Sequence, residues 1–512
     1  MRSIRALVGI LAVLVGWCLV GTGCGSGGVQ GVSAVATAAT NTVASSGVLN
    51  ASYENLIFVV TPDLANNNGD VNPATANLSG QGLQRVIRLA AFVQSTLLGS
   101  ASPGELYGLE PATHLQNGFP DLVPLEFLEQ LSVLEQYTED VLLPQPPTIT
   151  TGDSFPIDVS FTLASLPSGA AVPPAFYPSC QGLDFADSGG DNETLVNAVI
   201  ARRLPRAYVF ALPFATFQSL LAQLKVRNDY HYSVPAAWAG TNTVYVLTVP
   251  AGSLSIDATL TAVDTHVQVG TGYPQWTIPL PSTATPQQTP VEIQPATLAG
   301  SSVPATINRS ETLYLVRHAE AHPSSSWEDG NLVTQGDWRA LYLPEALAGK
   351  ITRPDVVYAV DPSQAILGMP SVSDPTRVVY SYVRTSQTVA PYAIANGIPF
   401  RVASGFQWTG IDAASEQTAI RQFVDFFFTG GSFSNRTVLV SWEHDHIPVI
   451  AQALLDRYFA NSTQAPTVPT WPGNDYDSIW SFTLDASGNL TFSNKLFEGI
   501  DSAALPSSPP SF

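Results

Sequence analysis

One apolar pattern occurs twice in this chain of 512 residues. The stretch ENLIFVVTPD at residues 54–63 matches ETLYLVRHAE at residues 311–320, except that Val60-Thr61 stands where the second copy has Arg317-His318. Continuous apolar runs of this kind indicate strands that are buried on both faces. An internal repeat constrains the fold strongly, because both copies must suit one scaffold.

Further blocks recur in the same order in both halves. The matched pairs are NLSGQG (77–82) with NLVTQG (331–336), LYGLEP (106–111) with VYAVDP (357–362), RAYVFALPFATFQSLLAQL (206–224) with RTVLVSWEHDHIPVIAQAL (436–454), and VYVLTVPAGSLSI (244–256) with IWSFTLDASGNLTF (479–492). In the third pair, Pro213 and Phe214 lie opposite Glu443 and His444. One block could arise by chance, but the shared order predicts a duplication. The first copy has kept the scaffold and lost the reactive side chains.

Two segments without periodic apolar residues divide the chain. Residues 25–50 are rich in Gly, Ala, Ser, Thr and Val, which is typical of a flexible tether. Repeated prolines at residues 277–306 disfavour helix interiors and central strands, so we interpret this segment as a linker. The expected bodies are residues 51–276 and residues 307–502, and a tail follows at residues 503–512.

The apolar runs alternate with stretches of helical character. In the second body these stretches cover residues 338–347, 388–396, 416–428 and 448–458. Strands that alternate with helices favour the α/β class with a largely parallel sheet.

Composition excludes one class of function. The formal net charge is −20, and only 12% of the residues are charged. A general binder of nucleic acid or another polyanion needs clustered Lys and Arg to neutralise phosphates. Any phosphate chemistry in this chain must therefore rest on a few local arginines.

The N-terminus has the pattern of an export signal. Arg2 and Arg5 precede an apolar run at residues 6–20, which is short for a membrane span. Small residues then lead to Cys24, as in the processing site of bacterial lipoproteins, although Gly21 stands where that site usually has Leu. We expect residues 1–24 to be a signal peptide with lipidation at Cys24 and an envelope location; ordinary cleavage and secretion is the alternative.

Cysteine usage gives no disulfide framework. Cys18 lies inside the expected signal, so Cys180 would be the one thiol left in the folded part. A single cysteine cannot form an internal disulfide.

Ionisable side chains gather where two predicted strands end in the second body. Arg317-His318 ends one strand and residues 443–446 (EHDH) end another, and four of the seven histidines lie in or near these two clusters, including His322. In open α/β sheets, ligands bind at the carboxyl ends of the strands. Between the clusters, Arg384 opens a predicted helix, whose N-terminus favours an anion. Taken alone, Arg384 would be interpreted as a surface ion-pair residue.

The motifs LYLVRHAEA, RTSQTVAPYA and VLVSWEHDHIPVIAQAL, in this order, resemble those of the histidine phosphatase superfamily, also called phosphoglycerate mutase-like. The WP…YD stretch at residues 471–477 resembles the end of smaller bacterial members. The resemblance covers residues 311 to about 500 and reaches the first body only through the repeat. It implies two tandem phosphoglycerate mutase-like domains, each with a mostly parallel sheet flanked by helices, the first of them degenerate.

The resemblance also implies roles for particular residues. His318 would be the nucleophile that takes the phosphoryl group, Arg317 and Arg384 would bind the phosphate oxygens, and His444 would donate a further hydrogen bond. The substrate would be a small phosphomonoester, and the family needs no metal or other cofactor.

The proton donor is less clearly marked. Asp445 matches the His-Asp arrangement of the acid phosphatase and phytase branch, and we expect it to protonate the leaving group. Mutase-like members instead use a Glu from an intervening segment, for which Glu416 is the nearest candidate and reads more simply as an exposed helical residue. Glu320 and Glu443 would orient the histidines or be solvated carboxylates.

Two other functions stay open on the sequence. The clusters around His318 and His444 could assemble zinc ligands, although Pro323 disfavours a helix that carries both His318 and His322, and a zinc site leaves Arg317 unexplained. Alternatively, the whole chain could be a non-catalytic envelope binding protein built on a duplicated scaffold. The first body is predicted to be catalytically silent.

Overall fold

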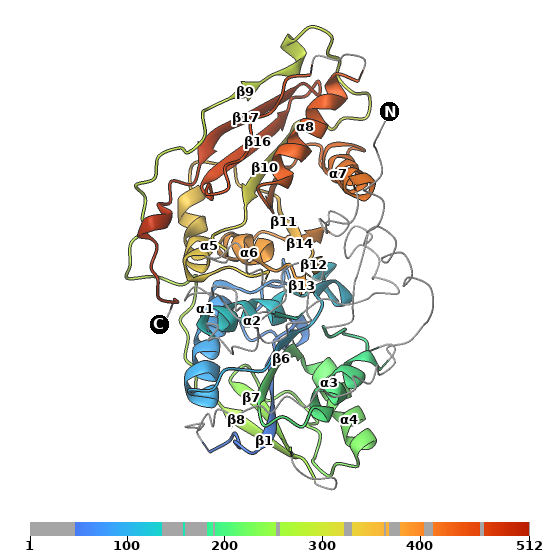
Figure 1. Cartoon of the computed structure of the whole chain (residues 1–512), viewed down its shortest axis with the longest axis vertical. Helices are drawn as coiled ribbons and strands as arrows, with labels where there is room; N and C mark the ends of the chain where they lie inside the picture. The colour runs from blue at the N-terminus through green and yellow to red at the C-terminus, as the bar shows by residue number, and fades with distance from the viewer. Residues whose placement is uncertain are drawn as a thin grey trace, which may run out of the picture. The chain divides into compact units, whose positions relative to one another are not determined.

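Two α/β sheets organise the chain (Figure 1). The computed structural model describes residues 47–135, 157–158, 182–187, 190–251, 257–321, 330–362, 365–367, 379–403, 413–460 and 465–510. Cys24, Cys180 and His322 lie outside these ranges. Within them, no helix has the length and apolar character needed to cross a membrane.

Each half of the chain contributes one sheet. The strand order of the first sheet is β5 (Ile157–Asp158), β2 (Leu106–Gly108), β6 (Ala207–Pro213), β1 (Tyr53–Thr61), β7 (Thr243–Pro250), β8 (Thr259–Asp264). The order of the second is β14 (Phe400–Ala403), β11 (Val356–Val360), β15 (Thr437–Trp442), β10 (Glu311–Arg317), β16 (Ser478–Leu484), β17 (Leu490–Phe497), β9 (Glu292–Ile293). In both sheets the first four strands in this order run parallel to one another. Each later strand runs antiparallel to the strand before it in the order. This confirms the predicted α/β class.

The two sheets also agree in register. Asn55 of β1 lies opposite Ala207 of β6, and Thr312 of β10 lies opposite Thr437 of β15. These four residues are the ones that the sequence repeat matches. The β2–β6 and β1–β7 pairs agree in the same way with β11–β15 and β10–β16. The repeated blocks therefore occupy equivalent places in the two sheets.

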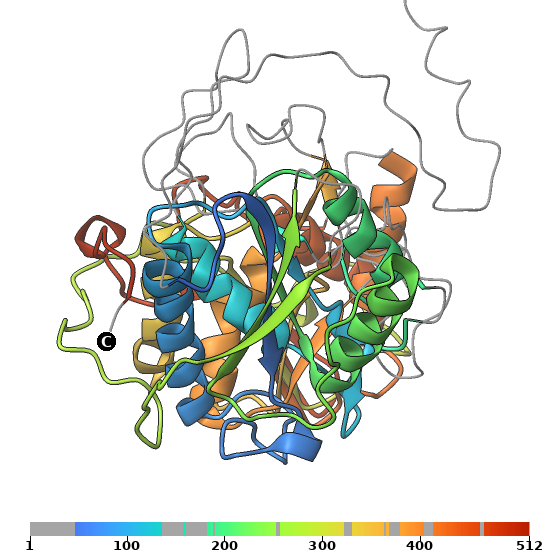
Figure 2. The ribbon, with the colours of Figure 1, turned by 90° about the horizontal axis from the view of Figure 1, so that it is seen from below.

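Helices cover both faces of each sheet. Their bounds are α1 (Gly80–Phe92), α2 (Val123–Leu134), α3 (Asp191–Ala201), α4 (Phe214–Asn228), α5 (Thr334–Leu347), α6 (Arg384–Asn396), α7 (Ala413–Phe428) and α8 (His446–Tyr458). Short elements are the ribbons β3–β4 (Leu115–Gln116, Phe119–Pro120) and β12–β13 (Ala365–Leu367, Val379–Ser381), and the single-turn helices η1 (Leu64–Asn66), η2 (Val93–Leu98), η3 (Pro111–Thr113), η4 (Pro295–Thr297) and η5 (Ser502–Ala504). Figure 2 shows α1 and α2 on one side of the first sheet and α3 and α4 on the other.

The two halves share a hydrophobic core. Ile57 and Val59 of β1 belong to the same buried cluster as Tyr314 and Val316 of β10. Helices α1, α2, α5 and α6 contribute to this cluster, and α6 contacts both α1 and α2. The alternate residues of each strand, such as Phe58, face separate clusters under α3 and α4 or under α7 and α8. Residues 41–512 accordingly form one compact unit.

The proline-rich segment interpreted as a linker packs against the second sheet. Residues 292–293 form β9, an edge strand that pairs with β17. Buried Gln288 donates to a carboxylate oxygen of Asp475 at 2.8 Å and accepts from the Trp480 indole at 2.9 Å. An edge strand is compatible with many prolines, because its outer N–H groups need no partner strand.

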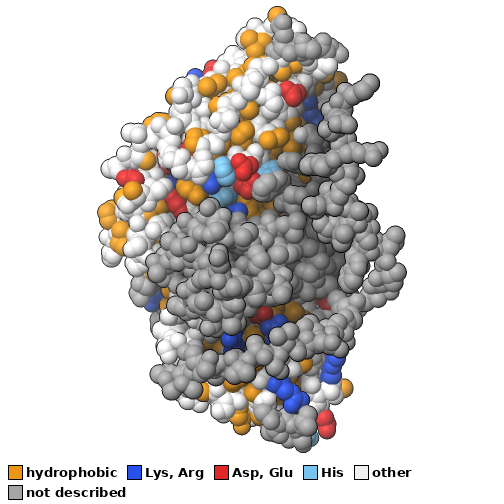
Figure 3. Space-filling view, in the orientation of Figure 1, with side chains coloured by type: hydrophobic (Ala, Val, Ile, Leu, Met, Phe, Trp, Pro, Cys, Tyr) orange, Lys and Arg blue, Asp and Glu red, His pale blue; other side chains and the backbone are white. Residues whose placement is uncertain are grey.

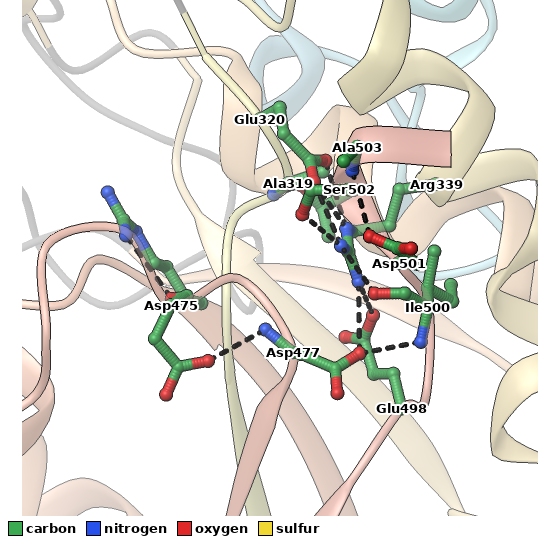
Figure 4. Close-up of polar contacts among 12 residues, drawn as sticks. Ala319, Glu320, Arg339, Asp475, Asp477, Glu498, Ile500, Asp501, Ser502 and Ala503 are labelled. Carbon is green, nitrogen blue, oxygen red and sulfur yellow. Dashed lines mark hydrogen bonds and ion pairs between the residues drawn. The ribbon is translucent and has the colours of Figure 1, made fainter. Parts of the chain in front are cut away.

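A buried ion network ties α5 to the C-terminal part of the chain (Figure 4). The fully buried guanidinium of Arg339 donates to Glu320 at 2.8 Å, to Glu498 at 2.7 Å and to the Ser502 hydroxyl at 2.9 Å. Asp477 lies 3.4 Å from the same guanidinium. Burial, together with Asp477, raises the pKa of Glu498 to about 8 although Arg339 opposes the shift. One cation therefore serves three buried carboxyl groups.

We expect Arg339→Leu to lower the free energy of unfolding by about 3–5 kcal/mol, because buried carboxylates lose their counter-ion. Arg85→Leu is the matched control. Arg85 stands at the equivalent place on α1 but contacts one carboxylate, Asp70, at 2.7 Å, so its loss should cost about 1–3 kcal/mol. Chemical denaturation of both variants measures the difference, and equal losses would contradict this account of the network.

Candidate active site

The neighbouring parallel strands β10 and β15 bring the two predicted clusters together. Arg317 lies opposite Trp442 in the register of the two strands. The backbone N–H of His318 then donates to the carbonyl of Trp442 at 2.8 Å. Residues 443–446 follow Trp442 directly, so both clusters lie at the same carboxyl edge of the sheet. Such an edge is where open α/β sheets bind ligands.

His318 is buried and has one defined tautomer. Its Nδ1 lies 2.7 Å from the carbonyl oxygen of Ala319, which can only accept a hydrogen bond. Nδ1 therefore carries the hydrogen, and Nε2 carries the lone pair. Burial, with the nearby charges of Arg384 and Arg317, holds the pKa of His318 well below its ordinary value. The residue is thus a neutral imidazole whose Nε2 can act as a nucleophile.

Arg317 is held by the loop before β16. Its Nη1 donates to the carbonyls of Gly473 at 2.6 Å and Asp475 at 3.2 Å, and its guanidinium carbon lies 3.9 Å from the centre of the Tyr476 ring. Its buried Nε has no hydrogen-bond partner in the described part of the chain. The loop thereby fixes the cation and leaves it a donor for an anion. The sequence indicates Tyr476 only as part of the WP…YD stretch, without a contact to Arg317.

Arg384 is the first residue of α6. It is buried, and its guanidinium carbon lies 4.7 Å from the centre of the Tyr382 ring. The hydroxyl of Thr388, one turn later, donates to the Arg384 carbonyl at 2.7 Å and accepts from the Ala319 N–H at 2.8 Å. Thr388 therefore joins the turn that carries Arg384 to the residue that fixes the His318 tautomer. Sequence reasoning missed Thr388; the only available signal was its place four residues after Arg384.

His444 and Asp445 form the exposed side of the site. The His444 side chain is 24% exposed and the Asp445 side chain 64% exposed, and His444 Nε2 lies 3.5 Å from Asp445 Oδ1. Burial and the charge of Arg317 lower the pKa of His444, although Asp445 and Glu443 oppose the shift. Its buried Nδ1 lacks a hydrogen-bond partner among the described residues. Figure 3 shows histidine, acidic and basic side chains close together in the upper half of the view, and other charged side chains are scattered over the visible surface.

The two glutamates expected near the histidines have different partners. Glu443 Oε1 lies 2.6 Å from Nδ1 of His446, the first residue of α8. Burial alone would raise the pKa of Glu443, but the hydrogen bond and charge of His446 bring it below its ordinary value. Glu320 contacts Arg339 in the ion network. Both carboxylates are buried, so neither is solvated, and Glu443 orients His446 rather than His318 or His444.

Three further expectations from the sequence concern Glu416, a metal site and the strand ends of the first half. Glu416 lies in α7, but its side chain is outside the described set. Within the described ranges, no group of three or more His, Cys, Asp or Glu residues is arranged to hold a metal ion. The matched strand ends of the first half carry Thr61 opposite Pro213, followed by Phe214, so the described residues there offer no histidine and no arginine.

Comparison with solved structures finds likenesses to two kinds of protein. A phosphoglycerate mutase from Plasmodium falciparum matches with 12% identity and a TM-score of 0.22, over 40% of this chain and 99% of that chain. A structure described as phosphohistidine phosphatase SixA from Agrobacterium tumefaciens matches with 16% identity and a TM-score of 0.20, over 34% and 92% of the two chains. A structure described as SixA from Nakamurella multipartitia matches with 19% identity and a TM-score of 0.22, over 36% of this chain and 88% of that chain.

No protein-family model and no curated protein matches the sequence. The chain is thus similar to solved structures of a phosphoglycerate mutase and of proteins described as phosphohistidine phosphatases.

Proposed function

We propose that the second half hydrolyses small phosphomonoesters through a phosphohistidine on His318. The observation that carries the proposal is the state of His318: a buried neutral imidazole, with Nδ1–H bonded to Ala319 and two arginines near enough to depress its pKa. A nucleophile of this kind beside fixed cations suits phosphoryl transfer, whose catalysis is mostly positioning and charge stabilisation.

The proposed reaction has two steps. Nε2 of His318 attacks phosphorus, and the bond from phosphorus to the leaving oxygen breaks while Asp445 gives that oxygen a proton. Water then attacks phosphorus and gives a proton to Asp445, the bond from phosphorus to Nε2 breaks with its electron pair returning to His318, and inorganic phosphate leaves. Arg317, Arg384 and His444 would bind the non-bridging oxygens during both steps.

Two further parts of the proposal concern the location of the protein and the role of its first half. We propose that the protein is exported and anchored through a lipid on Cys24, on the basis of the N-terminal sequence pattern. The first half is proposed to be catalytically silent, which is supported by the residues at its matched strand ends.

We expect His318→Ala to lower kcat/KM for p-nitrophenyl phosphate by more than about 1,000-fold, because the nucleophile is lost. Thr61→Ala, at the matched strand end of the first half, should keep wild-type activity. Labelled substrate and an alkaline quench should leave phosphate on the wild type and none on His318→Ala. Equal turnover by the two proteins would refute the phosphohistidine route.

The pH profile tests the protonation state of the nucleophile. Because the pKa of His318 lies below its ordinary value of about 6.5, the neutral form persists into acid. We therefore expect kcat/KM for p-nitrophenyl phosphate, whose leaving group needs no proton from Asp445, to hold between about pH 7.5 and pH 5.5, after correction for the substrate's own pKa near 6. Arg384→Gln removes a cation that opposes protonation, so its acid limb should move to higher pH. A wild-type limb at the ordinary histidine pKa would contradict this assignment.

A third prediction concerns the proton donor. Asp445→Asn should lower kcat by about 100-fold or more for an alkyl phosphate, whose leaving oxygen needs a proton. The same variant should lose far less with p-nitrophenyl phosphate, whose leaving group departs as a stable anion. Comparison of the two substrates on one protein separates proton donation from damage to the site. Equal losses on both would exclude Asp445 as the acid.

A further inference from the structure

Helix α2 of the first half reaches the active half through polar side chains. Most residues of this helix are buried, including several polar ones. The contacts across the halves are Gln130 Nε2 to Asp337 Oδ1 at 3.1 Å, Asn331 Nδ2 to Ser132 Oγ at 3.1 Å, and Ser386 Oγ with Glu129 Oε1 at 3.1 Å. The third contact matters for chemistry, because Ser386 stands in the first turn of α6, two residues after Arg384.

The Ser386 hydroxyl is within hydrogen-bond distance of two acceptors, one of which is Glu129. The Ser386 hydroxyl lies 2.6 Å from the carbonyl of Val383 and 3.1 Å from Glu129 Oε1. A hydroxyl has one hydrogen, and a carbonyl can only accept. The hydroxyl therefore either donates to Glu129 Oε1, or donates to Val383 while a neutral Glu129 donates to the hydroxyl oxygen.

The surroundings of Glu129 agree with a neutral acid. Burial raises the pKa of Glu129 well above its ordinary value and the neighbouring carboxyls raise it further, although the hydrogen bond with Ser386 opposes the shift. These neighbours are Glu126 on α2 and Asp337 on α5. Asp121, which pairs with His114, faces Glu126 in turn.

The first turn of α6 is fixed from three sides. The N–H groups of Val383 and Arg384 both donate to the carbonyl of Gly330, at 3.0 and 2.9 Å. Thr388 ties the turn to the His318 segment, and Ser386 closes it onto Val383. Glu129 supplies the contact from the first half. This turn carries Arg384, so a change in its position moves the phosphate-binding cation.

We propose that Glu129 is a positioning residue for Arg384: its carboxylic acid holds the Ser386 hydroxyl in the orientation that locks the first turn of α6. The half without catalytic residues thereby acts on the reaction in the other half. This inference rests on the proposed phosphate-binding role of Arg384.

We expect Glu129→Met to lower kcat/KM by about fivefold to tenfold, the size of one lost hydrogen bond, and to weaken inhibition by inorganic phosphate to a similar degree. Glu129→Gln, whose amide can donate to Ser386, should keep most activity. Glu135→Met is the matched control, because Glu135 is also buried at the end of α2 and burial raises its pKa to about 8, yet its buried Oε1 makes no hydrogen bond to the described residues. It should behave as the wild type.

A double-mutant cycle shows whether the effect passes through Arg384. In an Arg384→Ala background, Glu129→Met should cause no further loss; a full extra loss there would overturn the inference. Ser386→Ala removes the other end of the contact and should reproduce the loss, which keeps the test decisive if Glu129→Met fails to fold. If Glu129→Met and Ser386→Ala both show wild-type kinetics while His318→Ala is inactive, the positioning role of Glu129 is refuted and the proposed function stands. Turnover by His318→Ala would refute the function itself.

Discussion

Burial of one face of each sheet against the other half is the constraint on which the structure depends. A parallel sheet needs cover on both faces, and the inward residues of β1 and β10 reach a single cluster through α1, α2, α5 and α6. Each half therefore completes the core of the other. Neither half can therefore be removed without exposing this surface of the other.

The site depends on the same arrangement through backbone groups. His318 is fixed by the carbonyls of Trp442 and Ala319, and Arg317 by carbonyls of the loop at residues 473–475. Buried donors and acceptors of this kind are costly to leave unpaired, so the surrounding fold determines where these side chains lie. Thr388 joins two of these segments, and neither could shift without the loss of one of its hydrogen bonds.

The sequence predicted what depends on local pattern. The apolar runs of β1 and β10, and the order of the blocks after them, were enough for the α/β class and for the matching of strands. The strand-end position of His318 was visible for the same reason. The ion network around Glu320 was not, because its partner Arg339 and the other partners of that guanidinium, Glu498 and Ser502, come from distant parts of the chain.

Helix α2 shows the same limit. A helix with Glu126 and Glu129 would ordinarily turn its polar face to water. Here that face is buried against the second half, and only the pairing of the two halves reveals it. The sequence also did not predict the edge strand β9. Prolines exclude a central strand but not an edge strand, so the segment was interpreted as a linker.

The matched strand ends of the two halves also differ in the kind of side chain that they bury. Val60 is buried where the second half buries Arg317, and an apolar side chain there removes the cost of desolvating a cation. Phe214 stands where the second half has His444, and it packs near Phe217, with ring centres 6.3 Å apart. These positions lie at strand ends, outside the faces that form the shared core. Apolar residues there favour stability without disturbing the core that the two halves share, whereas the second half carries the desolvation cost of its buried cations.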